Sequence, residues 1–221
     1  MKIDDVELRW LGHAGFLIKN SSVIYIDPYN ISEGLEKADF ILITHSHYDH
    51  CSLPDLNKIV KDGTKVLCPA DCQSSIMKIT TPVRMEIIQP GSEFTFGKIK
   101  ISAIPAYNND KSYHPKEEGW VGYVVKINDV IIYHAGDTDN IDEMKKLTGY
   151  NQAEKKFIAL LPVGGKYTMD FEEAAEAAKT IKPFLAIPMH YGSVVGTKEH
   201  AENFKKECEE AKINAEVMVK E

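Results

Sequence analysis

The sequence lacks the features of a membrane protein, a secreted protein or a chain of linked domains. No apolar stretch approaches the roughly 20 residues that a membrane-spanning helix needs. Residues 1–5 lead directly into a strand-like pattern, with no signal-peptide pattern before it. No run rich in glycine and serine or in proline interrupts the middle. These absences predict one globular domain, residues 1–221, in the cytoplasm.

The chain also has no concentrated positive charge. It carries 26 Lys and Arg residues against 33 Asp and Glu residues, and its net charge is −7. A negative field repels phosphate backbones, so the sequence disfavours nucleic acid as a partner. We expect a small-molecule substrate and no membrane association, and a homo-oligomer is compatible with the sequence.

Cysteine is scarce and does not show the spacing of a zinc or disulfide motif. Its four members are Cys51, Cys68, Cys72 and Cys208, and none of them forms a Cys-x-x-Cys pair. Cys68 and Cys72 could be half of a metal site, but the missing second half favours reduced thiols in the core. Cys51 directly follows His50, so it could be sensitive to oxidation near the candidate site.

Short apolar segments separated by turn residues predict two β-rich halves, each accompanied by helices. Strands are predicted at 6–10, 14–18, 23–27, 40–44, 65–68, 83–89, 93–96, 99–104, 120–127, 130–134, 157–161, 184–187 and 215–219. Helices are predicted at 54–61 and 70–79, from a capping box at Asp170 and Glu173 to Thr180, and from Thr197 to about Ala211. An α/β fold with two mixed sheets face to face and helices outside, a four-layer αββα sandwich, would bury all of these strands.

The segment His45-Ser46-His47-Tyr48-Asp49-His50 carries four candidate metal ligands at the end of a buried type of strand. Residues two apart on an extended turn project to the same side, so His45 and His47 can converge on one ion. Asp49 and His50 can face a second ion close by. Imidazole and carboxylate suit zinc, manganese, iron or nickel.

With three further motifs, this segment resembles the signature of the metallo-β-lactamase superfamily. Ile26-Asp27-Pro28 resembles the family's early strand-end Asp, which supports the metal loop from behind. Tyr133–Thr138 matches the Gly-Asp-Thr strand end whose Asp bridges two metals, and Pro188–Gly192 matches the segment of the last histidine ligand. Leu11–Phe16 and Leu161–Asp170 are most similar to small hydrolases related to ascorbate-6-phosphate lactonase.

The resemblance implies the metallo-β-lactamase fold and a metal-dependent hydrolase with two divalent ions, zinc before manganese, iron or nickel. A metal-activated hydroxide would cleave an ester, lactone or phosphoester bond of a small metabolite, which an anionic group would suit. Asp49 would both bind a metal and orient the hydroxide. The implied metal ligands are His45, His47, Asp49, His50, His114, Asp137 and His190.

His114 is the least regular member of this set. The family usually places a histidine near the position of Tyr107, and the nearest one here is His114, seven residues on. We predict that a loop brings His114 back to complete the site of His45 and His47. Asn108 or water is the alternative at that position.

Further residues are expected near the candidate metal ligands. Asp27 and His134 are expected to support the ligands from behind. His13 could line the cleft or be structural, and Lys166 and Tyr167 could bind an anionic substrate, stabilise an oxyanion or only pack their loop.

The sequence leaves three other functions open. Related proteins include nucleases and cyclic-nucleotide phosphodiesterases, although the acidic balance argues against a nuclease. Others hold a di-iron redox centre, usually beside a flavin domain for which this chain has no room. A metal-binding protein without catalysis is the third alternative.

Overall fold

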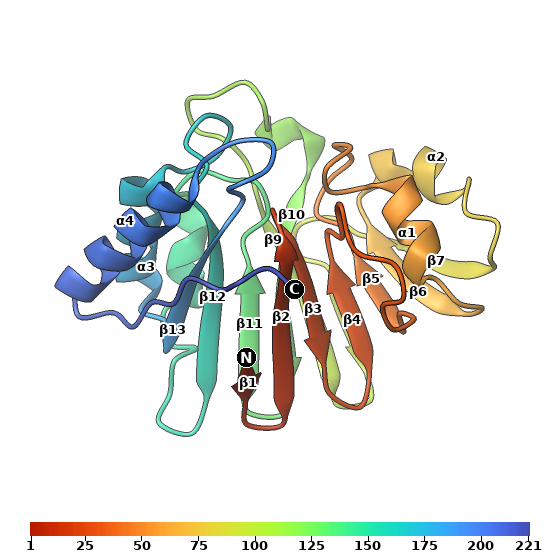
Figure 1. Cartoon of the computed structure of the whole chain (residues 1–221), viewed down its shortest axis with the longest axis horizontal. Coiled ribbons are helices and arrows are strands. Elements are labelled where there is room, and N and C mark those ends of the chain that lie inside the picture. The colour runs from red at the N-terminus through yellow and green to blue at the C-terminus, as the bar shows by residue number, and fades with distance from the viewer. The chain divides into compact units, whose positions relative to one another are not determined.

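Each half of the chain builds its own mixed β-sheet (Figure 1). The computed structural model describes residues 1–221, which form two units. Unit 1 comprises residues 1–89 together with 219–221, and unit 2 comprises residues 90–218.

The sheet of unit 1 begins as an antiparallel meander and continues as parallel strands. Its seven strands follow the order β1-β2-β3-β4-β5-β6-β7. They are β1 Lys2–Ile3, β2 Val6–Gly12, β3 Gly15–Lys19, β4 Val23–Ile26, β5 Phe40–Leu42, β6 Thr64–Cys68 and β7 Val83–Ile87. Pairing is antiparallel from β1 to β4 and parallel from β4 to β7. Parallel strands are usually buried on both faces, which explains the uninterrupted apolar run of β5.

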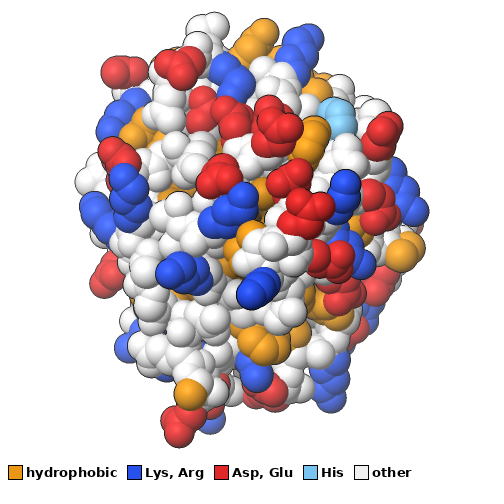
Figure 2. Space-filling view, turned by 90° about the vertical axis from the view of Figure 1, so that its left-hand side faces the viewer, with side chains coloured by type: hydrophobic (Ala, Val, Ile, Leu, Met, Phe, Trp, Pro, Cys, Tyr) orange, Lys and Arg blue, Asp and Glu red, His pale blue; other side chains and the backbone are white.

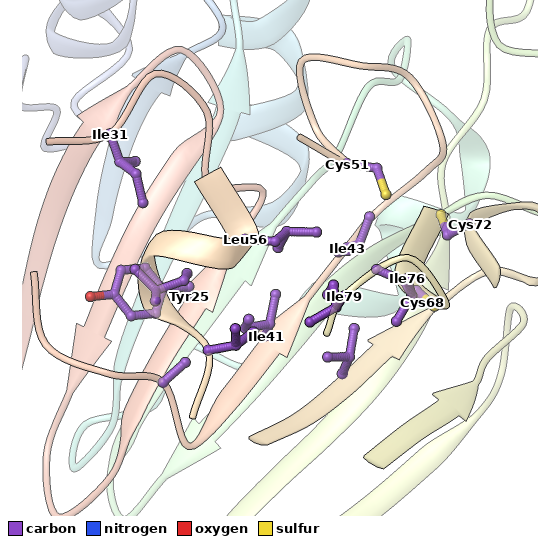
Figure 3. Packing of buried hydrophobic residues seen from close by; sticks show 14 of the residues in the cluster. Tyr25, Ile31, Ile41, Ile43, Cys51, Leu56, Cys68, Cys72, Ile76 and Ile79 are labelled. Atoms are coloured by element: carbon purple, nitrogen blue, oxygen red, sulfur yellow. The ribbon is translucent and has the colours of Figure 1, made fainter. Parts of the chain in front are cut away.

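Short helices supply the apolar partners of this sheet. They are α1 Leu53–Ile59, the 3₁₀ turn η1 Ala70–Cys72 and α2 Gln73–Ile76. Figure 3 shows Leu56 from α1 above Tyr25 and Ile41 of the strands, and Ile76 from α2 beside Cys68 of β6. All of them belong to one buried apolar cluster, so the helices are held by packing rather than by helix propensity.

The sheet of unit 2 has six strands in the order β13-β12-β11-β10-β9-β8. They are β8 Glu93–Phe96, β9 Ile99–Pro105, β10 Val121–Ile127, β11 Val130–His134, β12 Lys156–Pro162 and β13 Leu185–Met189. The turn dipeptides Gly97-Lys98 and Asn128-Asp129 predict two hairpins, and both are confirmed, since β8 pairs with β9 and β10 with β11 in antiparallel fashion. The connections then become parallel from β11 to β13.

Two longer helices and two 3₁₀ turns complete unit 2. They are η2 Lys116–Glu118, η3 Asp142–Leu147, α3 Phe171–Ile181 and α4 Lys198–Glu210. The alanines of α3 are buried, which makes one flat apolar face of the helix. The predicted α/β class with two mixed sheets is confirmed. No helix of the chain combines the length and the apolar character that a bilayer crossing requires.

Two sequence predictions need correction, and one short strand was missed. The predicted last strand, 215–219, does not form, because this segment meets β13 only in an isolated bridge between Ala215 and Ala186. The predicted helix 70–79 is shorter and begins as a 3₁₀ turn. The two-residue strand β1 was not predicted, because so short a segment has no readable alternation.

The predicted capping box forms at the start of α3, and its contribution to stability can be measured. The Asp170 carboxylate accepts from the Glu173 backbone N–H at 2.8 Å, and Glu173 accepts from the Asp170 N–H at 3.0 Å. We expect Asp170→Ala to lower the free energy of unfolding by about 1 kcal/mol. Thr197→Ala is the matched control, because the Thr197 side chain makes no capping hydrogen bond at α4. Urea unfolding of both variants measures the difference, and equal losses would contradict this role for Asp170.

Candidate metal centre

In unit 1 the candidate ligands follow the carboxyl ends of two parallel strands. Ile26, the last residue of β4, lies beside Leu42, the last residue of β5. Both strands point the same way, so Asp27 and the segment from Thr44 onward emerge at the same edge of the sheet. The Asp27 backbone N–H also donates to the Leu42 carbonyl at 3.1 Å. This pairing explains how residues 17 positions apart come into contact.

A chain of hydrogen bonds runs from His45 through Thr44 to Asp27. Asp27 is fully buried and accepts from the Thr44 backbone N–H at 2.8 Å and from the Thr44 hydroxyl at 2.6 Å. Because that hydroxyl proton is donated to Asp27, the Thr44 oxygen is left to accept from His45 Nδ1, 2.9 Å away. This fixes the proton of His45 on Nδ1. The lone pair of its Nε2 then points away from Asp27 and is available to a metal ion.

His50 is oriented by the same carboxylate. Its Nδ1 lies 2.7 Å from Asp27 Oδ2, and an ionised carboxylate only accepts, so Nδ1 carries the proton. The other nitrogen, Nε2, lies 3.7 Å from Asp49 Oδ2. Asp27 therefore sets the tautomers of both His45 and His50, which supports its predicted role behind the ligands.

Asp49 and His13 form the second part of the unit 1 cluster. His13 Nε2 lies 2.8 Å from Asp49 Oδ2, and the exposed fractions of these residues are only 2% and 6%. His13 and Asp27 also have left-handed backbones, with φ of 53° and 44°. Non-glycine residues adopt this conformation at a cost, and such strain often accompanies functional sites.

The donor set of unit 1 fits a divalent metal ion. His45 Nε2 and His47 Nδ1 lie 3.0 Å apart. Because the hydrogen bond to Thr44 places the His45 proton on Nδ1, His45 Nε2 is an acceptor. Candidate ligand atoms of His13, Asp49 and His50 all lie within 4.8 Å of one another. Imidazole nitrogens and carboxylate oxygens gathered in this way are the usual ligands of zinc and related metals.

In unit 2 the candidate ligands again follow parallel strands. The strands β11, β12 and β13 run in one direction, so the segments after His134, Pro162 and Met189 emerge at one edge. Asp137 and His190 lie in the first and third of these segments. The loop that carries His114 joins β9 to β10 at the same edge, where Tyr123 of β10 pairs with His134.

The carboxylate of Asp137 lies between two histidines. Its Oδ2 is 3.3 Å from His114 Nε2 and 3.0 Å from His190 Nε2, and all three residues are buried. His114 Nδ1 lies 3.0 Å from the Asn108 side-chain oxygen and 3.1 Å from the Tyr167 carbonyl. Both neighbours are acceptors, so Nδ1 carries the proton and Nε2 presents a lone pair toward Asp137. A cation between these atoms would suit the donor set of unit 2 as well.

The backbone around His190 leaves room only for glycine at position 164. A Cβ atom added to Gly164 would lie 2.8 Å from the His190 carbonyl oxygen and 3.1 Å from its Nδ1. His190 itself has φ of 60°. His134 is fully buried, and its Nδ1 accepts from the Gly136 N–H at 3.2 Å, which fits the predicted supporting position just before Asp137.

The predicted substrate-binding residues Lys166 and Tyr167 lie beside an exposed tyrosine, Tyr113. Lys166 Nζ is 4.9 Å from the centre of the Tyr167 ring, and Tyr113 meets that ring edge-on at 4.7 Å. A hydrogen bond with the Tyr167 hydroxyl raises the pKa of Lys166, so the amine is charged at neutral pH. The same Tyr167 touches His114 through its carbonyl, which connects this positive charge to the ligand loop.

Sequence reasoning missed the roles of Thr44 and Asn108 as supports of ligands. Thr44 stands next to His45, so its hydroxyl could have been considered as a local hydrogen-bond partner. Asn108 was weighed only as an alternative ligand. Its amide instead accepts from the His114 backbone N–H at 3.0 Å and donates to Asp139 and to the Tyr167 carbonyl, each at 3.0 Å.

Asn108→Ala should therefore weaken metal binding without removing a ligand. We expect the affinity of the site that includes His114 to fall roughly 10- to 100-fold, because the ring loses one of its two Nδ1 acceptors and its loop loses an anchor. Asn109→Ala is the matched control, since the Asn109 side chain bonds only to the Asn140 carbonyl. Competition with a chromophoric chelator measures both affinities, and equal values for the two variants would contradict this role for Asn108.

Comparisons with known proteins agree with this chemistry. The family model described as "Beta-lactamase superfamily domain" matches residues 7–190. A UPF0173 metal-dependent hydrolase of Thermoplasma acidophilum is 34% identical over 92% of this chain and 91% of its own length. A crystal structure from Parabacteroides distasonis has a TM-score of 0.83, with 28% identity over 96% of this chain and 92% of that one. The structure of a metallo hydrolase from Ignicoccus hospitalis has a TM-score of 0.74 with 26% identity, over 96% and 94% of the two chains.

Proposed function

This chain belongs to the metallo-β-lactamase superfamily as a metal-dependent hydrolase, and on that premise we propose which residues hold the metals and which bonds it cleaves. We propose two divalent metal ions, zinc before manganese, iron or nickel. The proposed ligands are His45, His47, Asp49 and His50 from unit 1 with His114, Asp137 and His190 from unit 2. Bound divalent ions supply a Lewis acid and a source of hydroxide at neutral pH.

One observation carries the ligand assignment. In each unit, hydrogen bonds to Nδ1 fix a histidine tautomer so that Nε2 is left as an acceptor: His45 and His50 through Asp27, and His114 through Asn108 and Tyr167. Partners that hold a ring by its second nitrogen are typical of metal-binding histidines. A purely structural histidine has no need of this arrangement at three separate positions.

The proposed substrate is a small metabolite with an ester, lactone or phosphoester bond and an anionic group. Lys166 supports the anionic group, because its charged amine belongs to the loop that contacts His114. Tyr113 is 44% exposed and adds an apolar surface to the same loop cluster. Similarity to lactonase-related hydrolases in residues 11–16 and 161–170 favours the lactone among these bonds. Asp49 would orient the attacking hydroxide.

We retain the phosphodiesterase alternative for small substrates such as cyclic nucleotides, and not for nucleic acids. Figure 2 shows acidic and basic side chains interspersed on the face that carries α4, as a solvated surface would have them. Along α4, Lys198, Lys205 and Lys206 lie within 4.0 Å of glutamates one turn on. A nuclease would need these charges free for phosphates.

The test combines metal analysis with a substrate panel. Elemental analysis is made on wild type and His114→Ala, both purified without added metal or chelator. We expect about two ions per wild-type chain and the loss of one in the variant. Chelation should abolish the hydrolysis of a lactone, an aryl ester, bis-p-nitrophenyl phosphate or a cyclic nucleotide, and added zinc should restore it.

The outcomes separate the parts of the proposal. Two ions retained in His114→Ala would remove His114 from the ligand set. Tightly held iron with a visible absorption band and no hydrolysis would favour a redox centre. A chain that binds no metal even after reconstitution would overturn the proposal as a whole.

A further inference from the structure

Three of the four cysteine side chains gather at one place in the core of unit 1. Cys51, Cys68 and Cys72 belong to the same buried cluster, and the Cys72 thiol interacts with both other thiols. Figure 3 shows the sulfur atoms of Cys51 and Cys72 turned toward each other across the top of the cluster. The fourth cysteine, Cys208, lies on α4 in unit 2 and has no thiol partner. The sequence gives no sign of this grouping, because Cys51 is 17 residues from Cys68.

The three thiols come from different segments of the chain. Cys68 ends β6, and Cys72 ends the 3₁₀ turn η1, so both are fixed by secondary structure. Cys51 instead belongs to the loop of candidate metal ligands. Its backbone N–H donates to the His47 carbonyl at 2.8 Å, and the N–H of His50 donates to the same oxygen at 3.0 Å. Any force on the Cys51 sulfur is therefore transmitted to the backbone of that loop.

We propose that Cys51 and Cys72 are a thiol modification site, at which a peroxide forms a reversible disulfide that pulls on the loop of His47, Asp49 and His50. Cys51 retains 6% exposure whereas Cys68 and Cys72 have none, so a small oxidant meets Cys51 first. Cys72 is the partner because it is the thiol that interacts with Cys51.

The reaction is balanced with hydrogen peroxide as the oxidant. The Cys51 sulfur attacks one peroxide oxygen, the O–O bond breaks, and water leaves a sulfenic acid on Cys51. The Cys72 sulfur then attacks the Cys51 sulfur, the S–S bond forms, the S–O bond breaks, and a second water leaves. Two thiols lose two electrons and two protons in total, and the peroxide is reduced to two waters. A thiol reductant reverses the bond.

The disulfide shortens a non-bonded contact between thiols to a covalent bond of about 2.05 Å. Since η1 is anchored in the core, most of that movement falls on the loop of Cys51. His50 is the neighbour of Cys51 and is held at 2.7 Å from Asp27, so its ring would be displaced from that partner. The bond itself forms independently of any hydrolytic activity, whereas its effect on metal affinity rests on the proposed function.

Peptide mapping tests the bond. Wild type, Cys51→Ser, Cys72→Ser and Cys208→Ser are treated with hydrogen peroxide, alkylated and digested with trypsin without reduction. Cleavage after Lys37, Lys58, Lys65 and Lys78 gives peptides 38–58 and 66–78, which carry Cys51 and the other two thiols. We expect a linked pair of these peptides in wild type and in the Cys208→Ser control, with fragmentation placing the link at Cys72.

Metal affinity, measured by chelator competition before oxidation, after oxidation and after reduction, tests the consequence. We expect a reversible loss of roughly 10-fold in wild type and no loss in Cys72→Ser. Complete alkylation of Cys51 after peroxide treatment would overturn the proposed disulfide between Cys51 and Cys72. An equal yield of linked peptides in Cys72→Ser would do the same. Linked peptides with unchanged metal affinity would overturn the coupling. Linked peptides in a chain that never binds metal would support the site and reject the proposed function instead.

Discussion

Asp49→Ala is expected to reduce turnover by roughly 10²- to 10⁴-fold, the usual contribution of a positioned acid or base. The Asp49 side chain is only 9% exposed, and its carboxylate lies 2.8 Å from His13 Nε2 and 3.7 Å from His50 Nε2. It is therefore surrounded by groups that can hold a cation, and it is the one carboxylate of the unit 1 cluster not used to orient a histidine from behind. Its removal takes away a proposed ligand and the group that would orient the nucleophile.

The fold should survive this substitution. His13 loses a hydrogen-bond partner, which costs about 1–3 kcal/mol at a buried position, whereas the loss of Asp27 would also free the Thr44 backbone N–H. The measurement is kcat on the best substrate of the panel, with circular dichroism and metal content on the same sample. Asp62→Ala is the control, because Asp62 is an exposed carboxylate of the same unit. Near wild-type turnover in Asp49→Ala would remove Asp49 from the chemistry.

Much of the architecture was predictable because hydrophobic periodicity and turn residues are local signals. The hairpin at Gly97-Lys98 and the capping box at Asp170 depend on neighbours within a few residues, and both form as expected. The segment 215–219 was wrongly predicted to be a strand for the same reason, because only local signals were used. Its apolar alternation is that of a strand, but a strand also needs a continuous partner edge, and Ala186 alone provides one bridge.

The candidate ligands and the supporting Asp27 were predictable as residue types at strand ends, but the individual hydrogen bonds that place the histidine protons were not. The proton positions of His45 and His50 depend on Asp27, which is about 20 residues away in sequence and adjacent only because β4 and β5 are parallel neighbours. Asn108 reaches His114 through a loop whose course no periodic pattern describes. The gathering of Cys51 with Cys72 likewise depends on tertiary packing. Sequence patterns thus identified the candidate ligands and Asp27, whereas the hydrogen bonds of Thr44 and Asn108 required coordinates.

Asp27→Ala is expected to cost both metal affinity and stability. The substitution leaves three buried donors without their acceptor: the Thr44 backbone N–H, the Thr44 hydroxyl and His50 Nδ1. We expect the free energy of unfolding to fall by about 3 kcal/mol, since each unsatisfied buried donor costs about 1–3 kcal/mol before the site relaxes. Metal affinity should fall roughly 10- to 100-fold or more, because the tautomers of His45 and His50 are no longer imposed.

Thr44→Val tests the orientation of His45 separately from that of His50. It removes only the hydroxyl, so His45 Nδ1 loses its acceptor while the bond between His50 and Asp27 remains. Metal affinity should therefore fall less than in Asp27→Ala, and Thr44→Ser, which keeps the hydroxyl, should stay close to wild type. Chelator competition and urea unfolding on the three variants give both quantities. If Thr44→Val and Thr44→Ser bind metal equally well, the hydroxyl does not orient His45. If Asp27→Ala retains wild-type affinity, Asp27 serves only to stabilise the loop, because histidines that bind metal without it do not depend on it for their orientation.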